Sequence, residues 1–269
     1  MNRISQCLQA CKQEGRKALV TYIVHGDPGL EHTLPSMHRL VEEGADIIEL
    51  GIPFSDPMAE GPVIQRGHER ALANGASLTN AMELVSQFRQ NNKHTPVVLM
   101  GYANPIERMG YSKLASSAAK AGVDGLLTVD LPPEEAEALN VELKQQGLEN
   151  IFLIAPTTTE ARMADITALA GGFVYYVSLK GVTGAGHLDV TSVQQKVEQI
   201  RKYTGLPVLV GFGIKDKDTA KAIGAVSDGV VVGSLLVKAM GEGESHDLKS
   251  ICDHLASLIK PIRKGLDEL

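Results

Sequence analysis

A short apolar run, residues 47–51, contains one carboxylate, Glu49, and then breaks into a loop rich in proline and glycine. The run is typical of a buried strand, in which side chains alternate, so Glu49 faces the opposite side from Ile48 and Leu50. A charge inside such a strand costs several kcal/mol unless it is paired, hydrated or used. Glu49 is also near the carboxyl end of the run, where parallel α/β proteins place their chemistry. The pattern therefore predicts acid–base catalysis.

Burial should raise the pKa of Glu49, which suits a group that both takes and gives a proton near neutral pH. The alternative is a structural acid paired with a barrel lysine, but no basic residue stands at the same level of the neighbouring predicted strands. Glu60, on the loop that follows, is the candidate for a second catalytic carboxylate. From its position alone, a solvent-exposed acid is an equally good interpretation.

The elements that must position these carboxylates are eight β-rich runs that alternate with helical patterns. The runs span residues 19–24, 47–51, 97–102, 125–130, 151–155, 173–178, 208–211 and 229–232. Eight βα units in about 250 residues are the expected size of a (β/α)₈ TIM barrel. A doubly wound sheet is the competing α/β architecture, but the turn at 25–29 lacks its GxGxxG pattern. With no linker or composition shift, we expect residues 1–269 to form a single TIM-barrel domain.

An amphipathic pattern before the first strand (Ile4, Leu8, Cys11) predicts an extra N-terminal helix that plugs the bottom of the barrel. Cys7 and Cys11 are four residues apart on this helix, and small buried hydrophobes are favoured over metal ligands. The histidines are scattered, and no His/Asp/Glu cluster has metal-ligand spacing, so no metal is expected.

Composition and charge argue against nucleic-acid-binding, membrane-spanning and secreted proteins. The 269 residues include 26 basic and 32 acidic side chains, for a net charge of −6. This charge and the absence of a Lys/Arg-rich run argue against nucleic acid as a partner. The sequence has no apolar run long enough for a membrane span, and its polar start is unlike a secretory leader. We expect a cytoplasmic protein.

Glycine clusters follow the last three predicted strands. The loops after strands seven and eight of a TIM barrel commonly bind phosphate, which makes Gly213, Gly233 and Ser234 candidate ligands, with Gly184 reaching over from the sixth loop. Ordinary strand-end turns are the alternative. The sixth loop, with three glycines around Thr183, is typical of a mobile lid, although a plain surface loop also fits.

Two other loop residues have competing interpretations. Lys180 is a solvated side chain, a phosphate-neutralising charge or a Schiff-base amine, and the first is favoured. Asp130 precedes Leu131-Pro132-Pro133, and capping of the helix that follows is favoured over catalysis.

Five segments, in order over nearly the whole chain, resemble the α subunit of tryptophan synthase. They are residues 49–57, 102–105, 130–132, 181–184 and 211–214. The resemblance implies a (β/α)₈ lyase that cleaves indole-3-glycerol phosphate to indole and D-glyceraldehyde 3-phosphate in L-tryptophan biosynthesis. It implies no cofactor in this chain. It also implies a pyridoxal-phosphate-dependent β subunit as partner, in an αββα heterotetramer.

Carried over by position, Glu49 matches the family's acid/base, which protonates indole C3 and assists the glycerol hydroxyl. Position 60 matches the second carboxylate, which interacts with the indole N–H. Gly184, Gly213, Gly233 and Ser234 match the phosphate site. The substrate pocket is expected to include Tyr22, Met100, Tyr102, Leu127, Leu153, Tyr175, Thr183 and Phe212.

The second carboxylate is usually aspartate in this family, and Glu60 is one methylene longer. Either the loop retracts to compensate, or the proton-transfer geometry is less favourable and intrinsic activity is lower, because a misplacement of ~1 Å can cost ~100-fold in rate. The rival functions are a Schiff-base aldolase using Lys180, a phosphosugar isomerase, and a regulator of a partner that has lost turnover. Near the barrel mouth we also expect exposed Phe54, Met58 and Ile106, which a β-type partner would cover.

Overall fold

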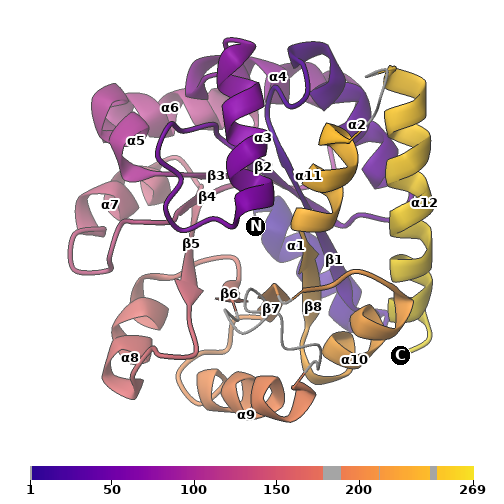
Figure 1. Cartoon of the computed structure of the whole chain (residues 1–269). Helices are drawn as coiled ribbons and strands as arrows, with labels where there is room; N and C mark the ends of the chain where they lie inside the picture. Colours follow the sequence, from indigo (N-terminus) through magenta and orange to yellow (C-terminus); the bar gives the residue numbers. More distant parts are fainter. Residues whose placement is uncertain (1, 178–188, 212, 243–246) are drawn as a thin grey trace.

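The computed structural model describes residues 2–177, 189–211, 213–242 and 247–269, and in them eight parallel strands close into a barrel in chain order. The predicted TIM barrel is confirmed, and Figure 1 shows the strands at the centre of a ring of helices. The strands are β1 (Ala18–Val24), β2 (Ile47–Gly51), β3 (Val97–Gly101), β4 (Gly125–Thr128), β5 (Glu149–Ile154), β6 (Val174–Val177), β7 (Val208–Gly211) and β8 (Gly229–Val232).

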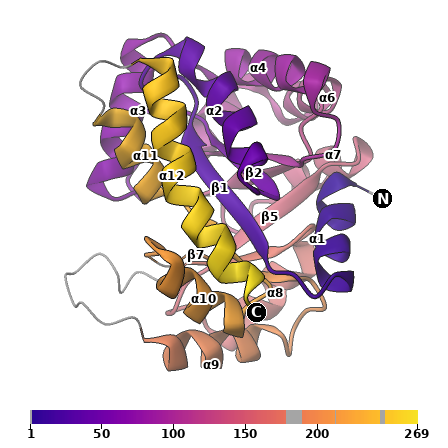
Figure 2. The same ribbon diagram turned by 90° about the vertical axis from the view of Figure 1, so that its right-hand side faces the viewer.

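The helices form the outer layer of the barrel, apart from the first. They are α1 (Arg3–Gln13), α2 (Leu30–Glu42), α3 (Pro62–Ala73), α4 (Leu78–Asn91), α5 (Ala103–Met109), α6 (Tyr111–Ala121), α7 (Glu137–Gln145), α8 (Glu160–Leu169), α9 (Val190–Ile200), α10 (Lys217–Val226), α11 (Ser234–Gly241) and α12 (Leu248–Asp267). The last, α12, packs between α10 and α2 and closes the ring (Figure 2). Among the described helices, none has the length and apolar character to cross a membrane.

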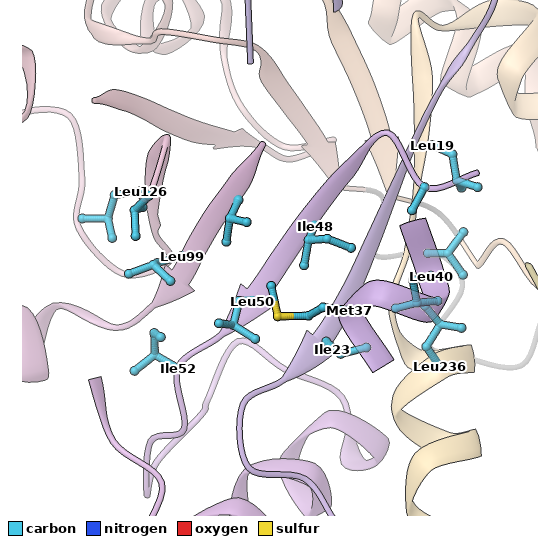
Figure 3. Close-up of a cluster of buried hydrophobic side chains, with 14 of the residues drawn as sticks. Leu19, Ile23, Met37, Leu40, Ile48, Leu50, Ile52, Leu99, Leu126 and Leu236 are labelled. Carbon is cyan, nitrogen blue, oxygen red and sulfur yellow. The ribbon is translucent and has the colours of Figure 1, made fainter. Parts of the chain in front are cut away.

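Alternation along β2 separates two layers of core. Ile47 points into the barrel, where it is buried with Val20 of β1 and Val98 of β3. Ile48 and Leu50 point outward to the helix layer, where Figure 3 shows them beside Met37 of α2. The register Tyr22↔Glu49↔Val98 then places Glu49 on the inner face, as its alternation with Ile48 and Leu50 predicts.

The N-terminal helix α1 closes one end of this interior. Its buried residues Ile4, Leu8 and Cys11 belong to the same cluster as the inward side chains of the strands, so the predicted plug is confirmed (Figure 2). Asn2 fixes the start of the helix: its Oδ1 accepts from Ile4 N, and its Nδ2 donates to Asp124 O at 2.8 Å.

The third and fourth strands are shorter than predicted, for a local reason. Tyr102 is the N-cap of α5, which begins directly after β3. Asp130, beyond the end of β4, accepts a hydrogen bond at Oδ1 from Ala103 N at 2.7 Å. Asp130 therefore caps α5 across the barrel edge. The expected capping of the helix that follows it is wrong, because α7 begins at Glu137.

Helix α3, which follows the loop carrying Glu60, is anchored to the barrel by an ion pair. Arg70 of α3 donates from Nε and Nη2 to both carboxylate oxygens of Asp27, at 2.6 and 2.9 Å. Asp27 is fully buried in the turn after β1. Removing one member of a buried pair leaves an uncompensated charge, so this contact fixes α3 firmly against β1.

Candidate active site

Glu49 is an ionisable residue that is shielded from solvent. Its side chain is 1% exposed, and neither carboxylate oxygen has a hydrogen-bond partner among the described residues. Burial, with the charge of Glu60 adding to it, raises the pKa of Glu49 to about 8. The alternative of a structural acid paired with lysine finds no support in the described part of the chain. A buried polar group without a partner calls for a functional explanation.

The loop that carries Glu60 is held by contacts on both sides. Ala59 N donates to Tyr102 Oη at 3.2 Å, and Gln65 Nε2 donates to the carbonyl oxygen of Glu60 at 2.9 Å. The ring of Phe54 stacks on Tyr102 with centroids 5.1 Å apart. Burial raises the pKa of Glu60 to about 7, so this loop acid is not a freely solvated one.

Both carboxylates line one cavity of about 330 Å³, together with Gly213, Gly233 and Ser234. Ser234 begins α11, whose first helical hydrogen bonds run from Leu236 N and Val237 N to Gly233 O. The N–H groups that precede them in a helix have no intrahelical acceptor and favour an anion. Three of the four predicted phosphate ligands and the two acids are thus brought to the same cavity.

A second, largely apolar cavity of about 500 Å³ adjoins the first. The two share Glu60, Met100 and Tyr175 in their linings, so Glu60 lies where they meet. Phe152 and Leu153 of β5 line the second cavity alone. A ligand with a flat apolar group at one end and an anion at the other fits this shape and charge.

The predicted substrate residues divide into three groups. Tyr22, Met100, Leu153 and Tyr175 line the cavities. In the described linings Leu127 and Tyr102 do not occur: Leu127 is packed in the barrel interior below, and Tyr102 holds the Glu60 loop. Thr183 and Phe212 lie outside the described residues, as do the predicted phosphate ligand Gly184 and the loop residue Lys180.

Sequence reasoning missed two kinds of residue. Ile64 of α3 and Ile214, in the segment between β7 and α10, contribute apolar lining. His68 of α3 is buried and contacts Tyr22. Its signal was present in the sequence, because His68 stands four residues after Ile64 and three before Ala71, on the inward face of the helix.

One group of side chains in the described part of the chain has the spacing of a metal site. Ligand atoms of Cys7, Cys11 and Asp46 lie within 4.8 Å of one another. Arg16 and Arg263 already donate to the carboxylate of Asp46, and their positive charges oppose a cation there. The absence of a metal in this protein stays a prediction.

The surface beside the mouth is partly as expected. Met58 is exposed over 78% of its surface, and Phe54 is half-buried against Tyr102. The expected exposure of Ile106 is wrong: it is 3% exposed, because α5 turns this residue into the core of the helix layer.

Comparison with known proteins gives a consistent result over the whole length. The family model for the tryptophan synthase alpha chain matches residues 8–265. The tryptophan synthase alpha chain of Dechloromonas aromatica is 52% identical over 269 residues, which cover 100% of this chain and 99% of the relative. That of Laribacter hongkongensis is 54% identical over 267 residues, with 99% and 100% covered.

Solved structures of tryptophan synthase agree with this match in sequence. Tryptophan synthase subunit alpha of Legionella pneumophila superposes with a TM-score of 0.93 at 42% identity, covering 100% of both chains. A tryptophan synthase from M. tuberculosis, in an aminoacrylate-bound form, contains a similar chain with a TM-score of 0.88 at 32% identity, covering 99% of this chain and 100% of that one.

Proposed function

Since this chain belongs to the tryptophan synthase alpha chain family, we propose that Glu49 and Glu60 are the catalytic carboxylates of that family's reaction. The chain is a carbon–carbon lyase that cleaves indole-3-glycerol phosphate to indole and D-glyceraldehyde 3-phosphate in L-tryptophan biosynthesis. The observation that carries the proposal is Glu49, a buried acid without a partner among the described residues, in a cavity that also reaches the start of α11.

The two adjoining cavities suggest how the substrate lies. Its phosphate binds at the N-terminus of α11, near Gly213, Gly233 and Ser234. Its indole ring occupies the apolar cavity, with Leu153 and Tyr175 against it. The glycerol carbons between them then pass Glu49 and Glu60. Phosphate binding far from the breaking bond supplies positioning.

In the proposed mechanism Glu49 first gives its proton to indole C3, and positive charge develops on the ring. The carboxylate of Glu60 stabilises that charge at the ring N–H. Glu49 then takes the proton of the hydroxyl on the carbon bonded to C3, that oxygen becomes the aldehyde oxygen, and the carbon–carbon bond breaks. Two carboxyl groups whose environments set different pKa values thus divide the work without a cofactor: Glu49 transfers the protons, and Glu60 stabilises the charge on the ring.

This function is tested by indole release from indole-3-glycerol phosphate as a function of pH. Glu60 must be ionised and Glu49 must start protonated, so kcat/KM should rise up to about pH 7 and fall above about pH 8. The two apparent pKa values belong to the interacting pair. Absence of indole release by the isolated chain would favour a regulator that has lost turnover. Labelling of the chain by borohydride with substrate would favour the Schiff-base aldolase.

We propose further that this chain works with a pyridoxal-phosphate-dependent β subunit in an αββα heterotetramer, in the cytoplasm. The exposed Met58 beside the mouth supports such a partner, as does the solved M. tuberculosis tryptophan synthase that contains a similar chain. Residues 1–269 are proposed to be one domain, because helices from both ends pack on the barrel.

The partner is tested by sedimentation of the chain mixed with its cognate β subunit. A larger species is expected, and Met58→Lys should weaken it by about tenfold or more because a charge would be buried in the interface. Val141, 49% exposed on α7, offers a control: Val141→Lys should leave the complex intact. Sedimentation of the two wild-type chains as separate species would contradict the proposal.

A further inference from the structure

His68 on α3 is a buried histidine whose two ring nitrogens both have neighbours. Nδ1 accepts a hydrogen bond from Phe54 N at 3.0 Å, and Nε2 lies 3.3 Å from Tyr22 Oη. Burial lowers the pKa of His68 to about 4, so the ring is neutral at working pH. A neutral imidazole carries one proton, and because Nδ1 accepts, that proton is on Nε2. His68 therefore donates to the hydroxyl oxygen of Tyr22.

Tyr22 is held in one orientation by its neighbours. Its ring crosses from β1 to β2, over Gly51: a Cβ on Gly51 would collide with Oη and lie 2.8 Å from Cζ. On another side the ring faces Gly233, where an added Cβ would lie 3.3 Å from Cδ1. Glycine at these two positions lets the phenol reach across the barrel mouth to His68.

No described residue accepts the hydroxyl hydrogen of Tyr22. Because Oη accepts from His68, its own O–H points away from the imidazole, and Tyr22 lines the same cavity as Glu49. The charges of Glu60 and Glu49 add to burial in raising the pKa of Tyr22, which agrees with both carboxylates facing it. Neither oxygen of Glu49 is hydrogen-bonded to Tyr22. A donor and an acceptor thus share one cavity without satisfying each other.

We propose that Tyr22 donates a hydrogen bond to the substrate hydroxyl that Glu49 deprotonates, and that His68 is the positioning residue that directs this donor. The inference rests on the proposed role of Glu49. The substrate oxygen accepts from Tyr22 and donates to Glu49. When the proton of the substrate hydroxyl moves to Glu49, the electron pair of the O–H bond forms the C=O bond of the aldehyde. The carbon–carbon bond breaks, and its electron pair restores the aromatic indole ring. Tyr22 keeps its proton and stabilises the oxygen as charge develops on it.

Tyr175 provides a contrast on the other side of the barrel. Its ring crosses from β6 to β7 over Gly211, as that of Tyr22 does over Gly51. Among the described residues, however, no imidazole lies behind its hydroxyl. The direction of the Tyr22 O–H is therefore set by His68, whereas no described group sets that of Tyr175.

Tyr22→Phe should lower kcat/KM about tenfold, the size of one hydrogen bond, with most of the loss in kcat. Binding of 3-indolepropyl phosphate, an analogue without either glycerol hydroxyl, should stay within about twofold, because that analogue offers Tyr22 no acceptor. Tyr203→Phe is the matched control, since it removes a phenol that donates to Glu160 on the surface. An equal loss of turnover and analogue binding would make Tyr22 a packing residue, and unchanged turnover would remove it as a donor.

His68 is tested with a pair of amides. Asparagine places an oxygen near the position of Nδ1 and keeps the Phe54 contact but lacks the donor; glutamine reaches toward Tyr22. His68→Asn should lose about as much kcat/KM as Tyr22→Phe, His68→Gln should recover part of it, and His68→Asn should add little to Tyr22→Phe in the double variant. Additive losses would make His68 merely structural. If Glu49→Gln kept its turnover, the proposed role of Glu49 would fail, whatever the Tyr22 variants did.

Discussion

Glu49→Gln should reduce kcat to less than about 10⁻³ of the wild-type value while KM stays within about tenfold. The amide keeps the shape of the protonated acid, so the cavity and its bound substrate change little. It can neither give a proton to indole C3 nor take one from the hydroxyl, and a single positioned proton transfer contributes about 10²–10⁴-fold. Single-turnover measurement of indole release checks the loss of chemistry separately from binding.

Glu49→Gln should also stabilise the fold at alkaline pH. The folded-state pKa of Glu49 is raised from 4.5 to about 8, so its contribution to stability is fully present below the unfolded value and lost as pH rises through about 8. A neutral amide does not ionise, so the variant loses no unfolding free energy at this position between pH 4.5 and about 8. The Tm of the variant near pH 9 should therefore exceed the Tm of the wild type. Glu149→Gln, on β5, is the control that should keep turnover. Substantial turnover by Glu49→Gln would remove Glu49 from the mechanism.

The barrel and the position of Glu49 could be predicted because both depend on local pattern. Alternation along residues 47–51 indicates which side chains face inward. The eight repeated strand–helix units predict a sheet that closes into a barrel. Neither inference needs to know which residues meet across the barrel. The same holds for Ile4, Leu8 and Cys11, whose helical spacing alone places them against the interior.

What the sequence could not supply is contact between elements. The sequence around Asp130 is typical of a residue that caps the next helix in the chain. Asp130 caps α5 instead, because the start of α5 lies beside the end of β4 in space. The resemblance places Tyr102 and Leu127 in the substrate pocket, which stays a prediction; it does not show that Tyr102 also holds the Glu60 loop or that Leu127 packs in the barrel interior. The helical spacing of His68 indicates that it faces inward, but not that it contacts Tyr22, which is 46 residues away in the chain.

The departure at position 60 gives a test of geometry as well as of charge. Glu60→Ala should lower kcat by about 10²- to 10⁴-fold, because the positive charge that builds at the ring N–H loses its counter-charge. KM should change less, since the interaction strengthens in the transition state. Glu60→Asp keeps the charge and should retain much more activity than the alanine variant. The activity of Glu60→Asp should exceed that of the wild type if the cavity is shaped for the shorter aspartate that is usual in the family.

The pH profile separates this role from a merely structural one. The charge of Glu60 adds to the raised pKa of Glu49, so Glu60→Ala should move the alkaline limb of kcat/KM to lower pH and abolish the acid limb near pH 7. Glu83→Ala, which removes an exposed acid from α4, should leave both limbs in place. Wild-type turnover by Glu60→Ala would remove Glu60 from the mechanism. The ring N–H would then have to be stabilised by some other group of the cavity.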